Sequence, residues 1–227
     1  TVTSAETTLK IPAGASFILT NGGGLGYGLF NLDERSRTWL LEHLEDIPDA
    51  LTRGAAWVTV WDNLLERHIT PLAFLTLATR ALPAEADEQN TQRILNYVTR
   101  AYWRFLPQEE RLARASALET LLRQGITRAK TTSQKSAWFS AFRDLVQTTD
   151  GVAWLARVWR REEKIPGLTF AEVDEINMAM ELAVRDVAGA EQILETQYQR
   201  IQNPDRKARF AFVRPALSVD PSERERS

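Results

Sequence analysis

Cysteine is absent from the 227 residues, and histidine occurs only twice. Without thiols the chain can form neither a disulfide nor a thiolate metal site, and its compartment stays undetermined. It has no signal peptide and no apolar run that approaches the ~20 residues of a membrane span, so we expect no membrane span. These absences leave a soluble protein, either cytoplasmic or periplasmic.

The histidines do not form a metal motif. His43 and His68 fall on different predicted helices, and neither lies four residues from another histidine, so the helical zinc pair is absent. His68 is expected at a helix end, where a partly charged imidazole suits the helix dipole. A G-x-S-x-G nucleophile motif is also lacking.

A glycine cluster and an acidic run are weak candidates for a functional site. The glycines between Gly22 and Gly28 lack the i, i+2, i+5 spacing of a dinucleotide fingerprint, and no Gly-Lys-Ser/Thr follows them. We therefore interpret them as a flexible turn. An acidic run surrounds a predicted helix end, where carboxylates are usually solvated: Glu42, Glu45, Asp46 and Asp49. The sequence thus predicts no catalytic, cofactor-binding or metal-binding residue in this chain.

The charge balance argues against a nucleic-acid partner. The formal net charge is −2, and arginines alternate with glutamates on predicted helix faces. A chain of this length buries roughly 70 % of its unfolded surface, which is enough for a substantial core.

Residues 17–33 differ from everything that follows. Ile18 and Leu19, and then Tyr27, Phe30 and Leu32, lie in short runs separated by glycines, which predicts two strand-like pieces around a tight turn. Thr7 to Pro12 alternates weakly and is a further strand candidate.

From Asp33 onward the pattern is helical. The strongest amphipathic helix lies between Glu85 and Leu106, with apolar residues spaced three and four apart. Helix starts are predicted at Asp33, Pro48, Thr70-Pro71, Pro107, Asn203-Pro204, and at a Thr169/Glu172 capping box, and a helix end is predicted near Gly125. Further helices are expected over 133–148, 151–164 and 189–202.

About ten helices in series indicate a stacked array. Apolar residues fall on two sides of the helix that holds Ala55 to Leu64, which is expected of an inner layer in an α-solenoid. No strict period of 34 or 40 residues occurs, so any repeats are degenerate. All seven tryptophans fall in predicted helices, mostly on apolar stripes; core packing is the default interpretation, and an aromatic ligand groove is the alternative.

Arg53 and Asp62 share one helix and are candidates for partly buried pairing groups, although the sequence does not name their partners. At the other end, Ser218 to Pro221 resembles a helix start, and only polar residues follow it. Truncation is the favoured interpretation of this end, and a frayed tail is the alternative.

Four segments together resemble the C-terminal region of aminopeptidase N-type (gluzincin) zinc aminopeptidases: ILTNGGGLGYGLFNLD, DALTRGAAWVTVWDNLLE, GLTFAEVDEINMAMELA and ILETQYQRIQNPDRKARFAFVRPALS. The matching positions are Asn21, Gly26, Tyr27 and Asp33 in the entry, Arg53 and Asp62 in the early helix, and Asn203, Asp205, Arg209 and Phe210 in the late turn.

The resemblance implies an all-α, armadillo- or HEAT-like α-α superhelix with a short N-terminal β-strand remnant. Residues 1–33 would be the entry from a preceding β-sandwich, and residues 34–227 the superhelix, truncated at its C-terminus. Such a domain is a lid that limits which peptides reach the zinc. Zinc and the catalytic residues would lie in the parent's catalytic domain, so this fragment would be inactive alone; its partners would be that domain and peptide substrates.

The other hypothesis is a free-standing helical-repeat scaffold that binds protein partners in a concave groove.

Overall fold

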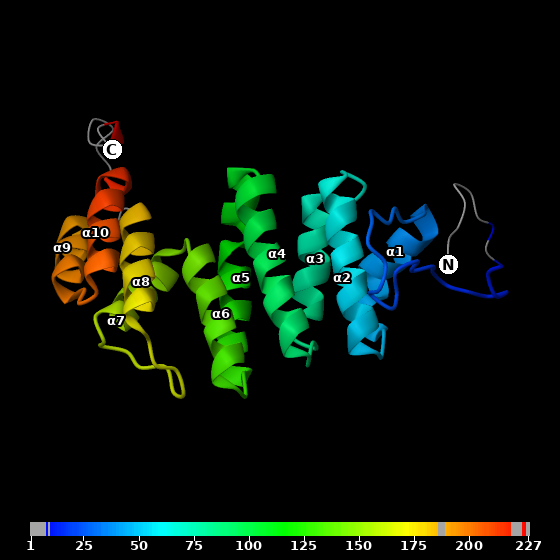
Figure 1. Ribbon diagram of the computed structural model, residues 1–227, viewed down its shortest axis with the longest axis horizontal. Helices are drawn as coiled ribbons and strands as arrows, with labels where there is room; N and C mark the ends of the chain where they lie inside the picture. The colour runs from blue at the N-terminus through cyan, green and yellow to red at the C-terminus, as the bar shows by residue number, and fades with distance from the viewer. Residues whose placement is uncertain (1–7, 9, 186–188, 219–223, 226–227) are drawn as a thin grey trace. The chain divides into compact units, whose positions relative to one another are not determined.

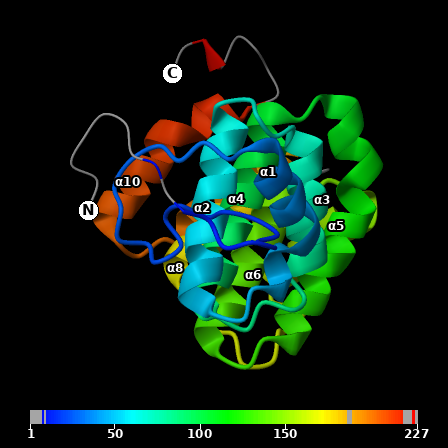
Figure 2. The ribbon, with the colours of Figure 1, turned by 90° about the vertical axis from the view of Figure 1, so that its right-hand side faces the viewer.

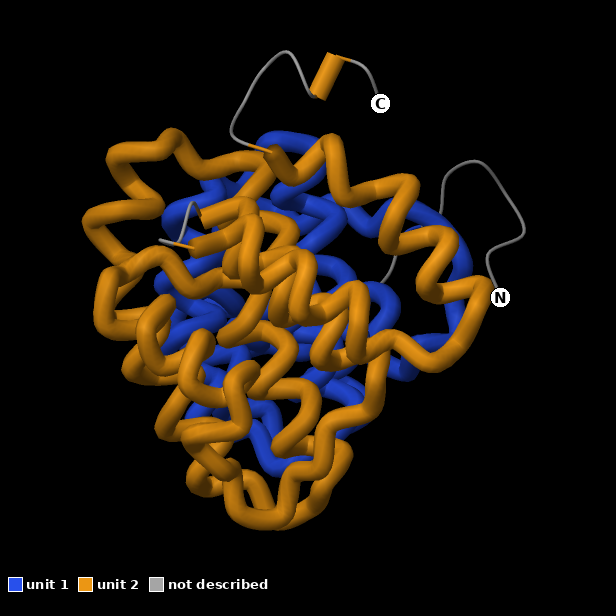
Figure 3. Tube along the Cα trace, turned by 90° about the vertical axis from the view of Figure 1, so that its left-hand side faces the viewer, with its two compact units in different colours: residues 1–98 blue, residues 99–227 orange. Residues whose placement is uncertain are grey.

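The computed structural model describes residues 8, 10–185, 189–218 and 224–225, and it is all-α over these residues (Figure 1). The described chain contains ten α-helices and two short 3-10 helices, and none of its residues forms a β-strand. The prediction of an all-α fold is therefore confirmed. Two compact units are present, residues 1–98 and 99–227, coloured separately in Figure 3.

The N-terminal unit is built from three helices and the beginning of a fourth: α1 (Glu34–His43), α2 (Ala50–Leu65), α3 (Pro71–Ala81) and α4 (Glu88–Phe105), which continues into the second unit. Trp57 and Phe74 are fully buried at its centre, with ring centroids 6.1 Å apart in an edge-to-face arrangement. Trp61 stacks on Tyr97 at 4.4 Å. Aromatic packing thus joins α2, α3 and α4.

Local sequence signals placed two of these helix starts correctly. Asp33 accepts the Ser36 N–H at 3.0 Å, and Thr70 accepts the Ala73 N–H at 3.2 Å ahead of Pro71. Each side chain satisfies a backbone donor that the helix leaves free. The helix predicted at Pro48 instead begins after Asp49, whose carboxylate accepts the Thr52 N–H at 2.7 Å.

The predicted strands in the entry segment are wrong for the described residues. Asn21 closes the glycine turn by accepting the Gly26 N–H at 2.8 Å and donating to the Gly26 carbonyl at 3.2 Å. A Cβ on Gly26 would approach Asn21 Oδ1 at 2.9 Å, so a side chain there would displace the amide that closes the turn. In the strand candidate at Thr7 to Pro12, residues 7 and 9 lie outside the described residues, and the other four form no strand.

Helix side chains, rather than a neighbouring strand, hold the entry segment. The Ile18 N–H donates to Ser36 Oγ at 2.8 Å, and Figure 2 shows the segment passing over the helices of this unit. Further along, Asn63 of α2 accepts the Leu32 N–H at 3.1 Å and donates to the Phe30 carbonyl at 2.9 Å. A β-strand pairs its backbone groups with those of a neighbouring strand. In this segment, single side chains form the hydrogen bonds to individual backbone N–H and C=O groups instead.

Replacing Asn63 with leucine should lower the free energy of unfolding by about 2–3 kcal/mol. The change removes the two bonds to the segment and a third to the Thr59 carbonyl, and it leaves a buried N–H unpaired. Amide exchange at Leu32 should accelerate relative to Leu40. The matched control is Thr59→Val, which removes only a bond within α2 and should cost under about 1 kcal/mol. Equal exchange at Leu32 in both variants would contradict the anchoring role.

The C-terminal unit continues from the end of α4 with six helices: α5 (Gln108–Arg128), α6 (Thr132–Leu145), α7 (Thr149–Trp159), α8 (Glu172–Val184), α9 (Ala190–Arg200) and α10 (Pro204–Val213). The predicted cap at Asn203 is confirmed, because its side chain accepts the Arg206 N–H at 3.0 Å. The helix start expected at Ser218 to Pro221 falls largely outside the described residues.

Two predictions about helix ends in this unit are wrong. α5 continues through Gly125 and ends three residues later, at Arg128. Inside the helix, the glycine leaves room for the indole of Trp138 on α6. The Thr169/Glu172 capping box does not form either. α8 begins after Ala171, whose N–H is accepted by Asp174 at 2.8 Å.

Candidate functional site

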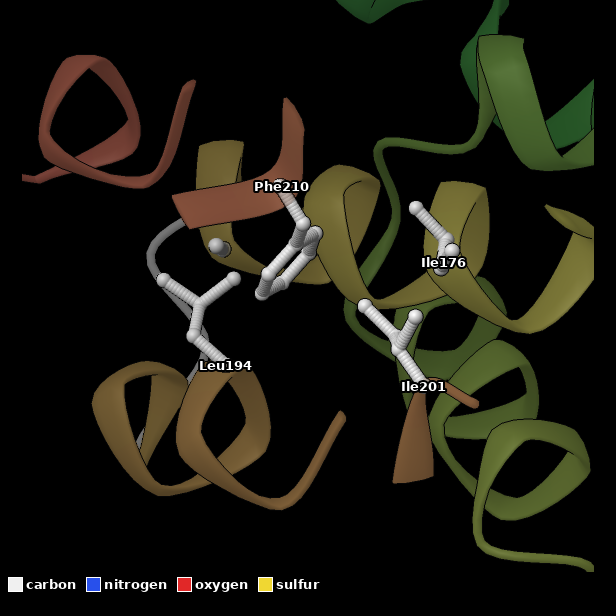
Figure 4. Packing of buried hydrophobic residues seen from close by; sticks show 5 residues of the cluster. Ile176, Leu194, Ile201 and Phe210 are labelled. Carbon is white, nitrogen blue, oxygen red and sulfur yellow. The ribbon is translucent and has the colours of Figure 1, made fainter. Parts of the chain in front are cut away.

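The three helices α8, α9 and α10 share one apolar cluster in the C-terminal unit (Figure 4). Phe210 of α10 is 2 % exposed and packs among Ile176 of α8 and Leu194 of α9. Ile201, just after α9, completes the contact. This packing fixes how α10 lies against α8, and it therefore positions the side chains on either side of Phe210.

A groove of about 410 Å³ lies between α8 and α10. Its volume is within the ~300–1,000 Å³ typical of small-ligand pockets. The lining residues recur three, four and seven positions apart on each helix, so each set occupies one helix face. They are Val173, Ile176, Asn177 and Met180 on α8, and Arg206, Arg209, Phe210 and Val213 on α10.

The groove combines an apolar floor with three polar groups. Arg206 forms an ion pair with Glu172, with 3.1 Å between the Arg206 nitrogen and the carboxylate oxygen. Arg209 is exposed, and Asn177 is partly buried; neither side chain makes a hydrogen bond to any described residue. One guanidinium and one carboxamide are thus free to bind a ligand.

Glu172 partly neutralises this positive edge. Its carboxylate accepts the Gln202 N–H at 2.6 Å and also receives Arg206. The bond from Gln202, followed by that from Arg206, lowers the pKa of Glu172, so this carboxylate is charged near neutral pH. The groove keeps one net positive charge, which favours a singly charged anion.

The sequence predicted no site at this groove, although it singled out two of the lining residues. Arg209 and Phe210 belong to the motif that carries the family resemblance. Asn177 was missed. An asparagine within the stripe from Val173 to Met180 is the signal that could have identified it, because such a residue is costly to bury without a partner.

The residues of the acidic run support the fold of the N-terminal unit. Glu45 pairs with Arg80, Asp49 caps α2, and Asp46 lies 3.1 Å from the His43 ring nitrogen. Burial is the largest single influence on Glu45 and opposes its ionisation. The bond from Arg80, a backbone bond and the nearby positive charges together outweigh burial and lower the pKa of this carboxyl. His68 lies in the turn after α2, where its backbone N–H donates to the Asn63 carbonyl.

Arg53 and Asp62 differ in their contacts. The Arg53 guanidinium donates hydrogen bonds to both carboxylate oxygens of Glu85, at 2.7 and 3.0 Å. It also donates to the Ile47 and Pro48 carbonyls at 2.9 Å. The bond to Glu85 raises the pKa of Arg53. Asp62 makes no side-chain bond to the described residues, and burial raises its pKa. Only Arg53 is therefore a pairing group here.

Most tryptophans belong to the core, as predicted. Five are buried, and the remaining two, Trp39 and Trp103, are partly exposed. Trp39 stacks on Phe17 at 3.9 Å beside a pocket lined mainly by polar side chains of α1. In that pocket the Asp33 carboxylate already accepts two bonds from Ser36.

No group of three or more histidine, aspartate or glutamate side chains could hold a metal ion within the described ranges. None of the helices described is both long and apolar enough to cross a membrane. Comparison of the sequence with protein-family models gives no match, and comparison with curated proteins gives none either.

Proposed function

We propose that this chain is the helical lid domain of a zinc aminopeptidase of the aminopeptidase N type. Its helices would form an armadillo- or HEAT-like superhelix that restricts access of peptides to a zinc centre in the same parent chain. A zinc-activated water in the catalytic domain would attack the peptide bond, and the helices would select substrates by shape and charge.

The observation that carries this proposal is the order and spacing of the four motifs along the chain. The structural roles of the motif residues agree with this proposal. Asn21 and Gly26 close a turn, Asp33 and Asn203 cap helices, and Phe210 lies in the core.

The first test is to read the sequence encoded upstream of Thr1. A His-Glu-x-x-His helix with a downstream glutamate is expected there. Its absence would contradict the proposal and favour the free-standing scaffold.

The second test assays the isolated chain with added zinc against aminoacyl-nitroanilides. We expect no turnover, whereas the parent should show chelator-sensitive hydrolysis of the same substrates. The matched control is the parent with its metal-binding glutamate changed to glutamine, which should be inactive. Robust, chelator-sensitive turnover by the isolated chain would overturn the assignment of chemistry to a separate domain.

A further inference from the structure

We infer that the α8–α10 groove binds an extended peptide segment in which a carboxylate lies next to a large apolar side chain. This inference goes beyond the lid function and does not depend on it, since the groove lies within one compact unit of the chain. Three features of the groove favour such a ligand: its apolar floor, the Asn177 amide and the residual positive charge.

The floor selects an apolar group. Ile176, Met180 and Phe210 line it, with Val173 and Val213 at its edges. Ile176 and Phe210 are already largely buried, so an apolar ligand side chain would cover mainly the exposed parts of Met180, Val173 and Val213. The burial of that side chain and of these parts gains roughly 25 cal/mol for each Å². A purely polar ligand such as inorganic phosphate would leave the floor unmatched.

The amide favours a peptide backbone. Asn177 carries one acceptor and two donors on a single planar group, and a peptide unit presents the complementary pair. Neither the acceptor nor the donors of this amide form a hydrogen bond with a described residue. Because the amide lies among apolar neighbours, its bonds to a ligand would be shielded from competing water.

The charge favours one carboxylate. Arg209 has no described partner, and Arg206 is shared with Glu172. A guanidinium matches the two oxygens of a carboxylate in a forked arrangement. A phosphate group carries roughly −1.5 to −2 charges, more than this edge compensates.

The test is an NMR titration of the ¹⁵N-labelled full chain with three N-acetylated peptides. Ac-Gly-Leu-Glu-amide carries a side-chain carboxylate, Ac-Gly-Gln-Leu carries a terminal carboxylate, and Ac-Gly-Leu-Gln-amide carries none. Saturable shifts are expected for the Asn177 side-chain amide and the Arg209 Nε–H. The Kd of at least one carboxylate peptide should be below about 1 mM and about tenfold below that of the neutral peptide.

The first two peptides separate the sources of the carboxylate. Binding of both identifies any carboxylate next to an apolar residue, and binding of Ac-Gly-Gln-Leu alone identifies a chain terminus. Equal affinity for all three peptides would overturn the inference, and so would the absence of saturable shifts.

Three variants assign the effect to the groove. Arg209→Gln should weaken carboxylate binding about tenfold and leave the neutral peptide unchanged. Glu172→Gln can still accept the Gln202 N–H but frees Arg206, so it should strengthen binding about threefold. Arg104→Gln removes the same charge from an exposed position on α4 outside the groove and should have no effect.

Arg209 is exposed, and Glu172→Gln keeps an acceptor for the Gln202 N–H, so circular dichroism should show unchanged helix content in both variants. Unaltered peptide affinity in a folded Arg209→Gln variant contradicts the inference. A concentration-dependent dimer that requires Arg209 also contradicts it, because a second copy would then be the occupant.

Discussion

Replacing Glu119 with alanine should lower the free energy of unfolding by about 4 kcal/mol, because the change leaves several buried donors without an acceptor. Glu119 of α5 is only 5 % exposed. Its carboxylate accepts the Gln147 N–H at 2.7 Å and the Thr148 N–H at 2.8 Å, and it also bonds the Thr148 hydroxyl. These three donors precede α7, and no turn of helix supplies them with acceptors.

The location of Glu119 adds an electrostatic contribution. The carboxylate lies at the N-terminus of α7, where the helix dipole stabilises a negative charge. A Cβ on Gly151, in the first turn of α7, would overlap this carboxylate, so the close approach of α5 depends on a glycine there. The loss should therefore destabilise the start of α7 as well as the loop before it.

Urea unfolding followed by circular dichroism provides the measurement, with two matched controls. Glu119→Gln keeps one acceptor oxygen and should cost only about 1–2 kcal/mol. Glu110→Ala removes a carboxylate from the surface of the same helix, where it pairs with Arg114, and should cost under about 1 kcal/mol. A loss below about 1 kcal/mol in Glu119→Ala would show that the acceptor role is unimportant.

Replacing Gly125 with valine should lower the free energy of unfolding by about 3 kcal/mol. Gly125 is buried within α5, where a Cβ would overlap the indole of Trp138 on α6. Trp138 is itself only 7 % exposed, so the ring has little room to move. The overlap outweighs the ~1 kcal/mol of helix propensity that a residue with a side chain normally gains over glycine.

A double-mutant cycle tests the cause of this loss. If the indole is the obstacle, Trp138→Leu should make the valine less harmful, and the combined loss should fall below the sum of the single losses by about 1 kcal/mol or more. Ala117→Val, at an exposed position of α5, controls for helix propensity and should cost under about 1 kcal/mol. Additive losses in the cycle would rule out the contact with Trp138 as the cause.

Helix starts were predictable where the signal is contained in a few neighbouring residues. Asp33, Thr70 and Asn203 cap their helices because the side-chain oxygen reaches a backbone N–H three residues ahead. The α4 stripe was predictable for a related reason, since a period of 3.6 residues places its apolar side chains on one face. Such features require no knowledge of distant parts of the chain.

The entry segment and Gly125 were misread because their neighbours lie far away in the sequence. Apolar residues between glycines are compatible with a strand, but Asn63, more than thirty residues later, supplies the bonds that hold an irregular path. A glycine such as Gly125 is common where a helix ends, which led to the predicted helix end. Its actual role is to leave space for the Trp138 side chain on the next helix.

Periodicity and capping act over a few residues, so they were enough to predict the helical class, most helix starts and the burial of most tryptophans. The pairing of Arg53 with Glu85, by contrast, follows from how the helices pack, and so does the position of Asn177 and Arg209 in one groove without described partners. Burial and pairing depend on which helix faces meet, and a local pattern does not contain that information. That arrangement arises from the packing of Phe210 against α8 and α9 and of Trp57 against Phe74, and neither contact is encoded in a local pattern.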